Sequence, residues 1–132
     1  MRILVAEDDP VGRKIIVKFL EPYGSCDVAV NGMDAVSAFK TACEEKQPYD
    51  LVCLDIMMPK MNGQDVLKEI RRIEEDMGIR GLNSAKVLMT TALDDSTNIM
   101  EAFKSKSDGY LTKPINRKLL QEKITEAFKQ KT

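Results

Sequence analysis

Short runs of apolar residues alternate along the chain with longer segments in which apolar residues recur every three or four positions. The runs at 2–6, 26–30, 51–54, 86–91 and 109–112 have the length of strands, and turn-forming or polar residues follow them. The longer segments have the period of amphipathic helices. The pattern therefore predicts five strands, each followed by a helix.

Residues with known end preferences delimit the helices. Pro10 suits the first position of a helix with Asp9 as its N-cap, Gly24 is expected to stop that helix, and Asn116 caps the last one. Polar residues at 94–96 offer caps for the fourth helix. The apolar residues expected to face inward are Val11, Ile15, Ile16, Phe19 and Leu20 in the first helix, Val36, Phe39 and Cys43 in the second, Val66, Leu67, Ile70 and Ile73 in the third, Ile99, Met100 and Phe103 in the fourth, and Leu120, Ile124, Ala127 and Phe128 in the last.

Five alternations of strand and helix predict a parallel sheet with helices on both faces. Right-handed crossovers restrict the topology to a few doubly wound orders. We expect an α/β fold of the flavodoxin-like (βα)5 type with strand order 2-1-3-4-5. At 132 residues the chain can bury a substantial core, and no repeat or linker interrupts it, so residues 1–132 are expected to form one domain.

The composition narrows the chemistry. The 20 basic and 21 acidic residues leave a net charge of -1, which gives no sign of a nucleic-acid footprint. The apolar start at 1–5 is too short for a signal peptide or a membrane span. Three cysteines without CxxC spacing indicate reduced core thiols and a cytoplasmic protein. The absence of histidine removes the commonest general base and transition-metal ligand.

Polar side chains follow four of the five strands. Glu7 and Asp8 follow the first, Asp55 the third, Thr91 ends the fourth, and Lys113 follows the fifth. Because parallel strands end at one edge of the sheet, these residues are expected to meet there. Carboxylates about 4 Å apart repel by about 4 kcal/mol at an effective dielectric near 20, so the cluster needs a counterion. Oxygen ligands favour a hard cation, and Mg²⁺ fits best because it accepts one or two carboxylates and keeps open positions for phosphate oxygens.

Such a site is suited to metal-assisted phosphoryl transfer onto a carboxylate. In this interpretation the cation and Lys113 screen the charge of the incoming phosphoryl oxygens, and the Thr91 hydroxyl donates to one of them. The competing interpretation has the acids as solvated loop residues and helix caps, with Lys113 an unrelated surface cation. The coincidence of polar residues at four strand ends favours the first.

Four motifs, in order along the whole chain, resemble those of the receiver (response-regulator) domains of two-component phosphorelay signalling. They are Leu4–Asp9 with Arg13 in the following helix, Asp55–Gly63, Thr90–Ala92, and Gly109–Pro114. As a set these motifs are highly specific. The chain departs from the family pattern at Asn62, where Asp is frequent, which should be harmless in a turn.

The resemblance implies roles for the acidic residues. Asp55 would be the phosphoacceptor and also part of the Mg²⁺ site, and Asp8 would be a direct ligand of the ion. Glu7 would orient metal-bound water, and the main-chain carbonyl of Met57 would complete the metal site. Because Arg13 lies five residues past Asp8, the family alignment makes Glu7 and Asp8 the active pair and leaves the next acid as the helix cap.

The resemblance also implies a switch. The Thr91 hydroxyl would move toward the phosphoryl group, Lys113 would contact the phosphate, and the ring of Tyr110 would move inward in response. The Lys113–Pro114 peptide bond would be cis, since X-Pro is the one place where that isomer costs little. The segment 76–85 is longer than a minimal receiver needs, and is either an added partner contact or a tolerated loop.

The expected function is a stand-alone signalling switch rather than a conventional enzyme. The switch would promote only its own phosphorylation and dephosphorylation. Its phosphoryl donor would be a sensor histidine kinase or a histidine phosphotransfer protein, because the chain has no histidine. A downstream effector would bind the face formed by helix 4, strand 5 and helix 5, and neither nucleic acid nor membrane would be a direct partner. The alternative is a receiver module excised from a hybrid kinase or multidomain regulator.

Two other classes share part of this pattern. A flavodoxin-like ligand-binding protein would need a Gly- or Ser/Thr-rich phosphate loop after the first strand, where this chain has three acids. A haloacid-dehalogenase-like phosphatase uses a strand-end Asp but has a second Asp two residues later, and here that position is Met57.

Overall fold

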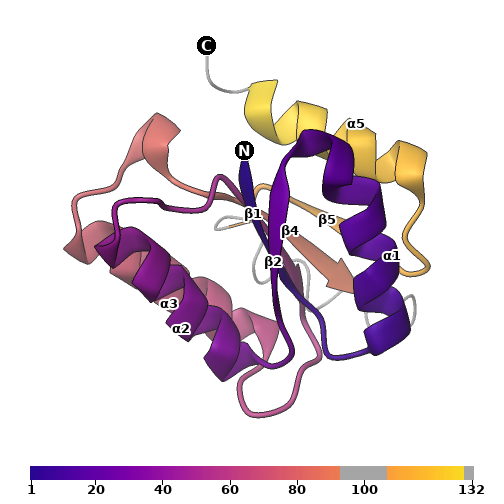
Figure 1. Cartoon of the computed structure of the whole chain (residues 1–132), viewed down its shortest axis with the longest axis horizontal. Helices are drawn as coiled ribbons and strands as arrows, with labels where there is room; N and C mark the ends of the chain where they lie inside the picture. The colour runs from indigo at the N-terminus through magenta and orange to yellow at the C-terminus, as the bar shows by residue number, and fades with distance from the viewer. Residues whose placement is uncertain (93–106, 130–132) are drawn as a thin grey trace.

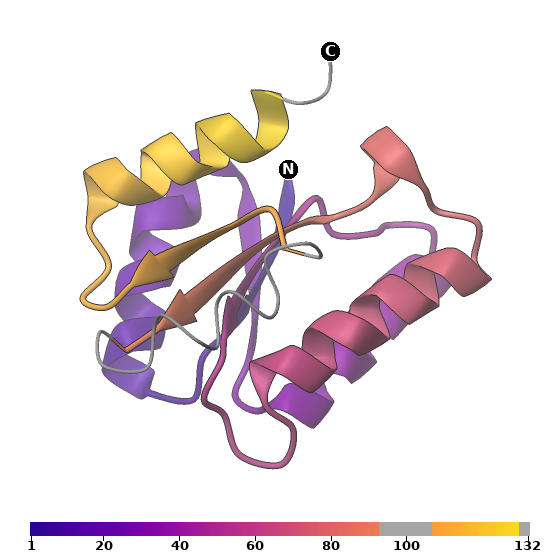
Figure 2. The ribbon, with the colours of Figure 1, turned by 180° about the vertical axis from the view of Figure 1, so that it is seen from behind.

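The structure is a computed structural model that describes residues 1–92 and 107–129. Within these residues a parallel sheet lies between two layers of helices, with α1 and α5 on one face and α2 and α3 on the other (Figures 1 and 2). The strands are β1 (Arg2–Ala6), β2 (Ser25–Ala29), β3 (Leu51–Asp55), β4 (Lys86–Thr91) and β5 (Gly109–Thr112), and the helices are α1 (Pro10–Leu20), α2 (Gly32–Glu44), α3 (Gly63–Asp76) and α5 (Arg117–Lys129). The predicted fourth helix, with its caps at 94–96, lies outside the described residues.

The strand order is β2-β1-β3-β4-β5 and every neighbouring pair is parallel, which confirms the predicted doubly wound topology. β3 is the central strand, and all five of its residues are buried. The continuous apolar run before Asp55 is explained by this position, because a central strand covered by helices on both faces has no solvent-facing side.

The alternation of side chains across the sheet divides the interior into two cores. In β1, Ile3 and Val5 point toward α1 and α5, whereas Leu4 and Ala6 point toward α2 and α3. In β3, Leu51 and Cys53 face the first core, while Val52 and Leu54 face the second. At the carboxyl ends of the strands, both cores are bordered by polar loops.

Side-chain caps begin the helices as predicted. Asp9 accepts a hydrogen bond from Gly12 N at 3.1 Å, and Asn116 accepts one from Leu119 N at 3.1 Å. α1 ends at Leu20, before the predicted stop at Gly24, and a 3-10 turn (Glu21–Tyr23) fills the interval. That turn contains Pro22, which lacks the N–H needed to continue an α-helix.

The prediction that Val11 and Ile15 face the core is wrong. Val11 is 66% exposed and Ile15 41% exposed, whereas Ile16 and Leu20 on the same helix are buried. The part of α1 that contacts the sheet is narrower than the apolar face of the helix. Its remaining apolar residues therefore stay on the surface beside the carboxyl edge of the sheet.

The long segment 76–85 leaves α3 and returns to β4 through a short 3-10 turn, Gly81–Asn83. It is anchored by Glu74, which is 3% exposed and accepts hydrogen bonds from Ala85 N at 2.7 Å and from Arg71 Nη1 at 2.8 Å. Arg71 also lies 3.2 Å from Asp108 and so links α3 to the start of β5. These contacts hold the segment against α3 and the start of β5.

Candidate functional site

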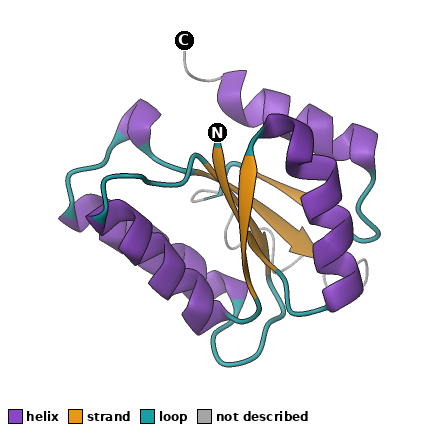
Figure 3. Ribbon diagram, in the orientation of Figure 1, coloured by secondary structure: helices purple, strands orange, loops and turns teal. Residues whose placement is uncertain are grey.

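The predicted site residues lie at the carboxyl edge of the sheet, either as the last residue of a strand or in the loop that follows it. In Figure 3 the arrowheads of the strands mark this edge. Glu7 and Asp8 follow β1, and Asp55 ends the neighbouring β3. Thr91 ends β4, and Lys113 directly follows β5. The strand order therefore brings together residues that are more than 100 positions apart in the sequence.

Three carboxylates converge at this edge. Glu7, Asp8 and Asp55 each offer one oxygen, and these atoms all lie within 4.8 Å of one another. Glu7 is 1% exposed and Asp55 3% exposed, while Asp8 faces solvent. The cluster thus has two buried acids and one open side.

Lys113 is the cation that balances the two buried acids. Its Nζ lies 2.9 Å from Glu7 Oε1 and 3.2 Å from Asp55 Oδ2. A single ammonium cannot neutralise both carboxylates, so the cluster keeps excess negative charge. Buried charge without full compensation is costly, and proton uptake is one way to reduce that cost.

The pKa values reflect this imbalance. Burial, together with the hydrogen bond and negative charge of Glu7, raises the pKa of Asp55 to about 7 from an ordinary value of 3.8. Burial also acts to raise the pKa of Glu7, but hydrogen bonds from Asp55, Lys113 and the Asp9 backbone outweigh it and lower that pKa. Burial opposes the charge of Lys113, yet its two acidic partners hold its pKa above the usual value. Of the two buried carboxyl groups, Asp55 is therefore the one whose charged form is disfavoured.

The loop after β1 gives its three successive acids different positions. The carboxylate of Glu7 accepts a hydrogen bond from Asp9 N at 3.2 Å, and Asp9 itself caps α1. Arg13 Nη1 donates to the carbonyl oxygens of Glu7 at 3.0 Å and Asp8 at 3.5 Å. The structure thus agrees with the assignment of Asp9 as the cap. In the sequence Arg13 served only to align the acidic residues, and its contact with the loop carbonyls was not predicted. The sequence signal for this contact is the position of Arg13, five residues past Asp8.

The loop after β3 holds Asp55 from the other side. Asp55 Oδ1 accepts a hydrogen bond from Met57 N at 3.2 Å, and Gly63 N donates to Ile56 O at 2.8 Å to close the loop. A Cβ at Gly63 would lie 2.6 Å from the Asp55 carbonyl oxygen, so only glycine permits this approach. The sequence signal was the Asn62-Gly63 pair, which indicated a turn but not this contact.

The two predicted switch residues lie on adjacent strands. Thr91 is fully buried, and its hydroxyl donates to Ala92 O at 3.4 Å. Tyr110 is 41% exposed, with Lys123 Nζ 5.7 Å from its ring centroid. The Lys113–Pro114 peptide bond after β5 is cis, which confirms that prediction.

The donor set suits a small hard cation. Its side-chain members are carboxylate oxygens of Glu7, Asp8 and Asp55, and buried Glu7 Oε1 lacks a well-aligned hydrogen bond although Lys113 is near. Mg²⁺ prefers such oxygen ligands and retains several waters, which the exposed side at Asp8 can admit. The residues present therefore fit the predicted ion.

A family model for the response regulator receiver domain matches residues 3–125. The chain belongs to this family. Among similar curated proteins, the regulatory protein VanRB of Enterococcus faecalis is 34% identical over 94% of this chain, which spans 50% of VanRB. The osmosensing histidine protein kinase SLN1 of Saccharomyces cerevisiae is 32% identical over 96% of this chain, which spans only 10% of that kinase. The receiver domain thus occurs both in regulators and in kinases.

Some relatives have nearly the length of this chain. Chemotaxis protein CheY-3 of Vibrio cholerae is 33% identical, and the match covers 98% of this chain and 93% of CheY-3. A solved structure of the S. cerevisiae Ssk1 receiver domain with the histidine phosphotransfer protein Ypd1 is 28% identical, with a TM-score of 0.77, and covers 95% of this chain and 86% of that one. The chain therefore has the phosphorelay receiver role. No helix in residues 1–92 and 107–129 is long and apolar enough to cross a membrane.

Proposed function

We propose that the chain is a switch in which Asp55 accepts a phosphoryl group from a phosphohistidine in a Mg²⁺-dependent reaction. The observation that supports this most directly is the position of Lys113, which lies within 3.2 Å of Asp55 Oδ2 beside two further acids. This distance supports the proposal that Lys113 contacts a phosphoryl group added to Asp55. Glu7, Asp8 and Asp55 with the Met57 carbonyl would hold the ion, which would supply charge screening for the phosphoryl oxygens.

The transfer involves one bond formed and one broken. A carboxylate oxygen of Asp55 attacks phosphorus, the P–N bond of the phosphohistidine breaks, and the imidazole nitrogen leaves with the electron pair. Because the attacking group must be ionised, the raised pKa of Asp55, about 7, opposes the reaction, and a bound cation would favour the ionised form of this carboxyl. Lys113 then moves its ion pair from the Asp55 carboxylate to the new phosphoryl oxygens.

The switch is reset by hydrolysis. A water oxygen attacks phosphorus, the P–O bond to Asp55 breaks, the carboxylate leaves with the electron pair, and inorganic phosphate is released. In this proposal the chain acts only on its own acyl phosphate. Thr91 donates its hydroxyl hydrogen bond to the phosphoryl group instead of Ala92 O, and Tyr110 responds by leaving its half-exposed position.

The partners follow from the same reaction. The donor would be a sensor histidine kinase or a histidine phosphotransfer protein of the class seen with the Ssk1 receiver. Exposed Val11 and Ile15 line an apolar groove of about 260 Å³ that also contains Lys113, and this groove is where the donor would dock. The effector would bind the face of helix 4, β5 and α5, on which Tyr110 lies. The free thiols of Cys26, Cys43 and Cys53 favour a cytoplasmic location.

Acetyl phosphate, a small phosphoryl donor, tests the proposal without a known kinase. With Mg²⁺, intact-mass measurement should show one added phosphoryl group, and removal of Mg²⁺ by a chelator should prevent the addition. Asp55→Asn should abolish the addition. Asp50→Asn, directly before the first residue of the same strand, is the matched control and should still be labelled. Labelling of Asp55→Asn at the native level would show that Asp55 is not the acceptor.

A further inference from the structure

β2 is an edge strand with unused hydrogen-bonding capacity. Within residues 1–92 and 107–129 it pairs only with β1. Ser25 N donates to Met1 O and Glu7 N donates to Ala29 O, so Ser25 and Ala29 point their backbone groups toward β1. Because these groups alternate along a strand, the N–H and C=O of Cys26 and Val28 point away from the sheet.

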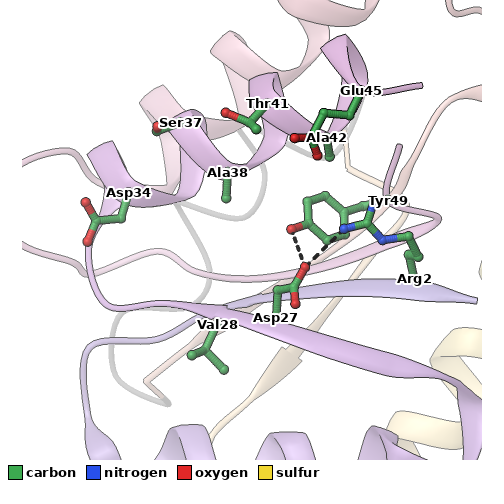
Figure 4. Close-up of a pocket in the computed structure, with 10 residues that line it drawn as sticks. All are labelled: Arg2, Asp27, Val28, Asp34, Ser37, Ala38, Thr41, Ala42, Glu45 and Tyr49. Carbon is green, nitrogen blue, oxygen red and sulfur yellow. Dashed lines mark hydrogen bonds and ion pairs between the residues drawn. The ribbon is translucent and has the colours of Figure 1, made fainter. Parts of the chain in front are cut away.

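An acidic groove flanks β2 on the side of α2. It has a volume of about 510 Å³, and its charged residues are Arg2, Asp27, Asp34 and Glu45. Figure 4 shows Asp27 rising from β2 to Tyr49, with which it hydrogen-bonds at 2.7 Å, and to Arg2 at 3.2 Å. Because Arg2 balances Asp27, the two acids of the α2 wall give the groove its negative character. Small side chains on that wall, Ser37 and Thr41, leave the groove open.

A basic groove flanks the same strand on the side of α1. It has a volume of about 460 Å³ and contains Arg13, Lys14 and Lys18 against the single acid Glu21. Val28 is 51% exposed and borders both grooves, and its side chain points away from α2 (Figure 4). The exposed edge of β2 therefore lies between two grooves of opposite charge.

We propose that the β2 edge is a docking site for an extended segment of another protein, which adds as a sixth strand beside Cys26 and Val28. Side chains of an added strand point alternately to the two faces of the sheet. The two grooves therefore select a segment in which basic and acidic residues alternate. Its basic residues enter the acidic groove beside α2, and its acidic residues enter the basic groove beside α1. Backbone hydrogen bonds to the two outward residues supply the pairing, and the charges supply register and selectivity.

A second copy of this chain is a poor occupant of the edge. In a symmetric dimer, the outward N–H and C=O groups of one β2 strand would pair with those of the other. Two strands related by a two-fold axis can pair in this way only if they run antiparallel, with the axis perpendicular to the sheet. That operation keeps the faces of the sheet aligned and places acidic groove beside acidic groove and basic beside basic. Like charges across an interface oppose association, so the charge pattern disfavours self-pairing and favours a partner of alternating charge.

Amide exchange and titration with short peptides test this proposal. The probe is a capped peptide of about eight residues in which Lys and Glu alternate, and the control peptide has the same composition with all Lys preceding all Glu. We expect the alternating peptide to slow amide exchange at Cys26 and Val28 and to bind about tenfold more tightly than the control. Equal binding of the two peptides, or binding without protection of these two amides, overturns the proposal.

Charge variants locate the effect at the edge. Lys18→Glu in the basic groove and Thr41→Lys in the acidic groove should each weaken binding of the alternating peptide about tenfold. Lys118→Glu and Thr125→Lys make the same changes on the exposed side of α5 and serve as matched controls. Equal effects at both places overturn the proposal, as does a dimer that protects Cys26 and Val28 without peptide. Acetyl phosphate labelling is expected to be unchanged throughout, so this outcome is separate from that of the phosphoacceptor site.

Discussion

The Asp55→Asn substitution should stabilise the metal-free protein, and the gain should depend on pH. In the native state the Asp55 carboxyl is buried beside Glu7, which raises its pKa to about 7 from 3.8. Between these two values the folded protein holds a proton that the unfolded chain releases. The free energy of unfolding therefore falls as pH rises through this window, by about 1.4 kcal/mol per pH unit from this group.

Asparagine has no such titration, so the variant lacks this slope. Between pH 5 and pH 7 the variant should gain about 2–3 kcal/mol relative to the native protein, and the gain should level off above the pKa of Asp55. For a domain of this size that difference corresponds to about 10 °C in the midpoint of thermal unfolding. Millimolar Mg²⁺ should reduce the gain at pH 8, because binding stabilises the native protein and competes with the proton at Asp55.

Urea unfolding followed by circular dichroism, in the presence of a chelator at pH 5, 6, 7 and 8, measures the effect. Asp50→Asn removes a carboxylate at the amino end of the same strand and is the matched control. A gain for Asp55→Asn that is equal at pH 5 and pH 8 would refute the reasoning, because the excess negative charge at the buried cluster would then have no energetic consequence.

The remaining predictions concern the loops and the switch. Asp8→Ala should abolish Mg²⁺ binding measured by calorimetry, whereas Asp9→Ala should mainly lower the free energy of unfolding by about 0.5–2 kcal/mol through loss of the N-cap; reversed effects would mean that the two acids are misassigned. Gly63→Ala should lower stability by about 1–3 kcal/mol and weaken Mg²⁺ binding, because its Cβ would overlap the Asp55 carbonyl; native stability and affinity would contradict that contact. Thr91→Ala should permit phosphorylation by acetyl phosphate but weaken the accompanying change at Tyr110, observed by NMR of the ring; a native response of Tyr110 would argue against its coupling to Thr91.

Sequence patterns were sufficient for the architecture and for the location of the site. The apolar run before Asp55 predicted a strand, and the alternation of strands and helices led to the sheet order that the structure shows. The meeting of Asp55 with Lys113 followed from that order, because parallel strands end at one edge. The helical spacing of apolar residues did not distinguish Asp9 from Glu7 and Asp8. Pro10, which marks the start of the helix, and the receiver motifs identified Asp9 as the cap.

The burial of individual side chains could not be predicted from the sequence where it depends on how closely one element packs against another. The helical period placed Val11 and Ile15 in the core, but a period cannot say how wide a stripe of α1 the sheet covers. Glu74 was not among the residues expected to face inward, yet it is buried because it accepts a hydrogen bond from Ala85 N in a loop whose path the sequence does not specify. The raised pKa of Asp55 likewise depends on burial and on distances that only the folded structure supplies.

The central claim is that Asp55 forms an acyl phosphate, and chemical trapping tests it most directly. Borohydride reduces an aspartyl phosphate to homoserine, so the protein is treated with acetyl phosphate and Mg²⁺, reduced, and analysed by peptide mapping. We predict homoserine in place of Asp55 and unmodified side chains at Asp8 and Asp50. Homoserine at either of those positions, with Asp55 intact, would contradict the account.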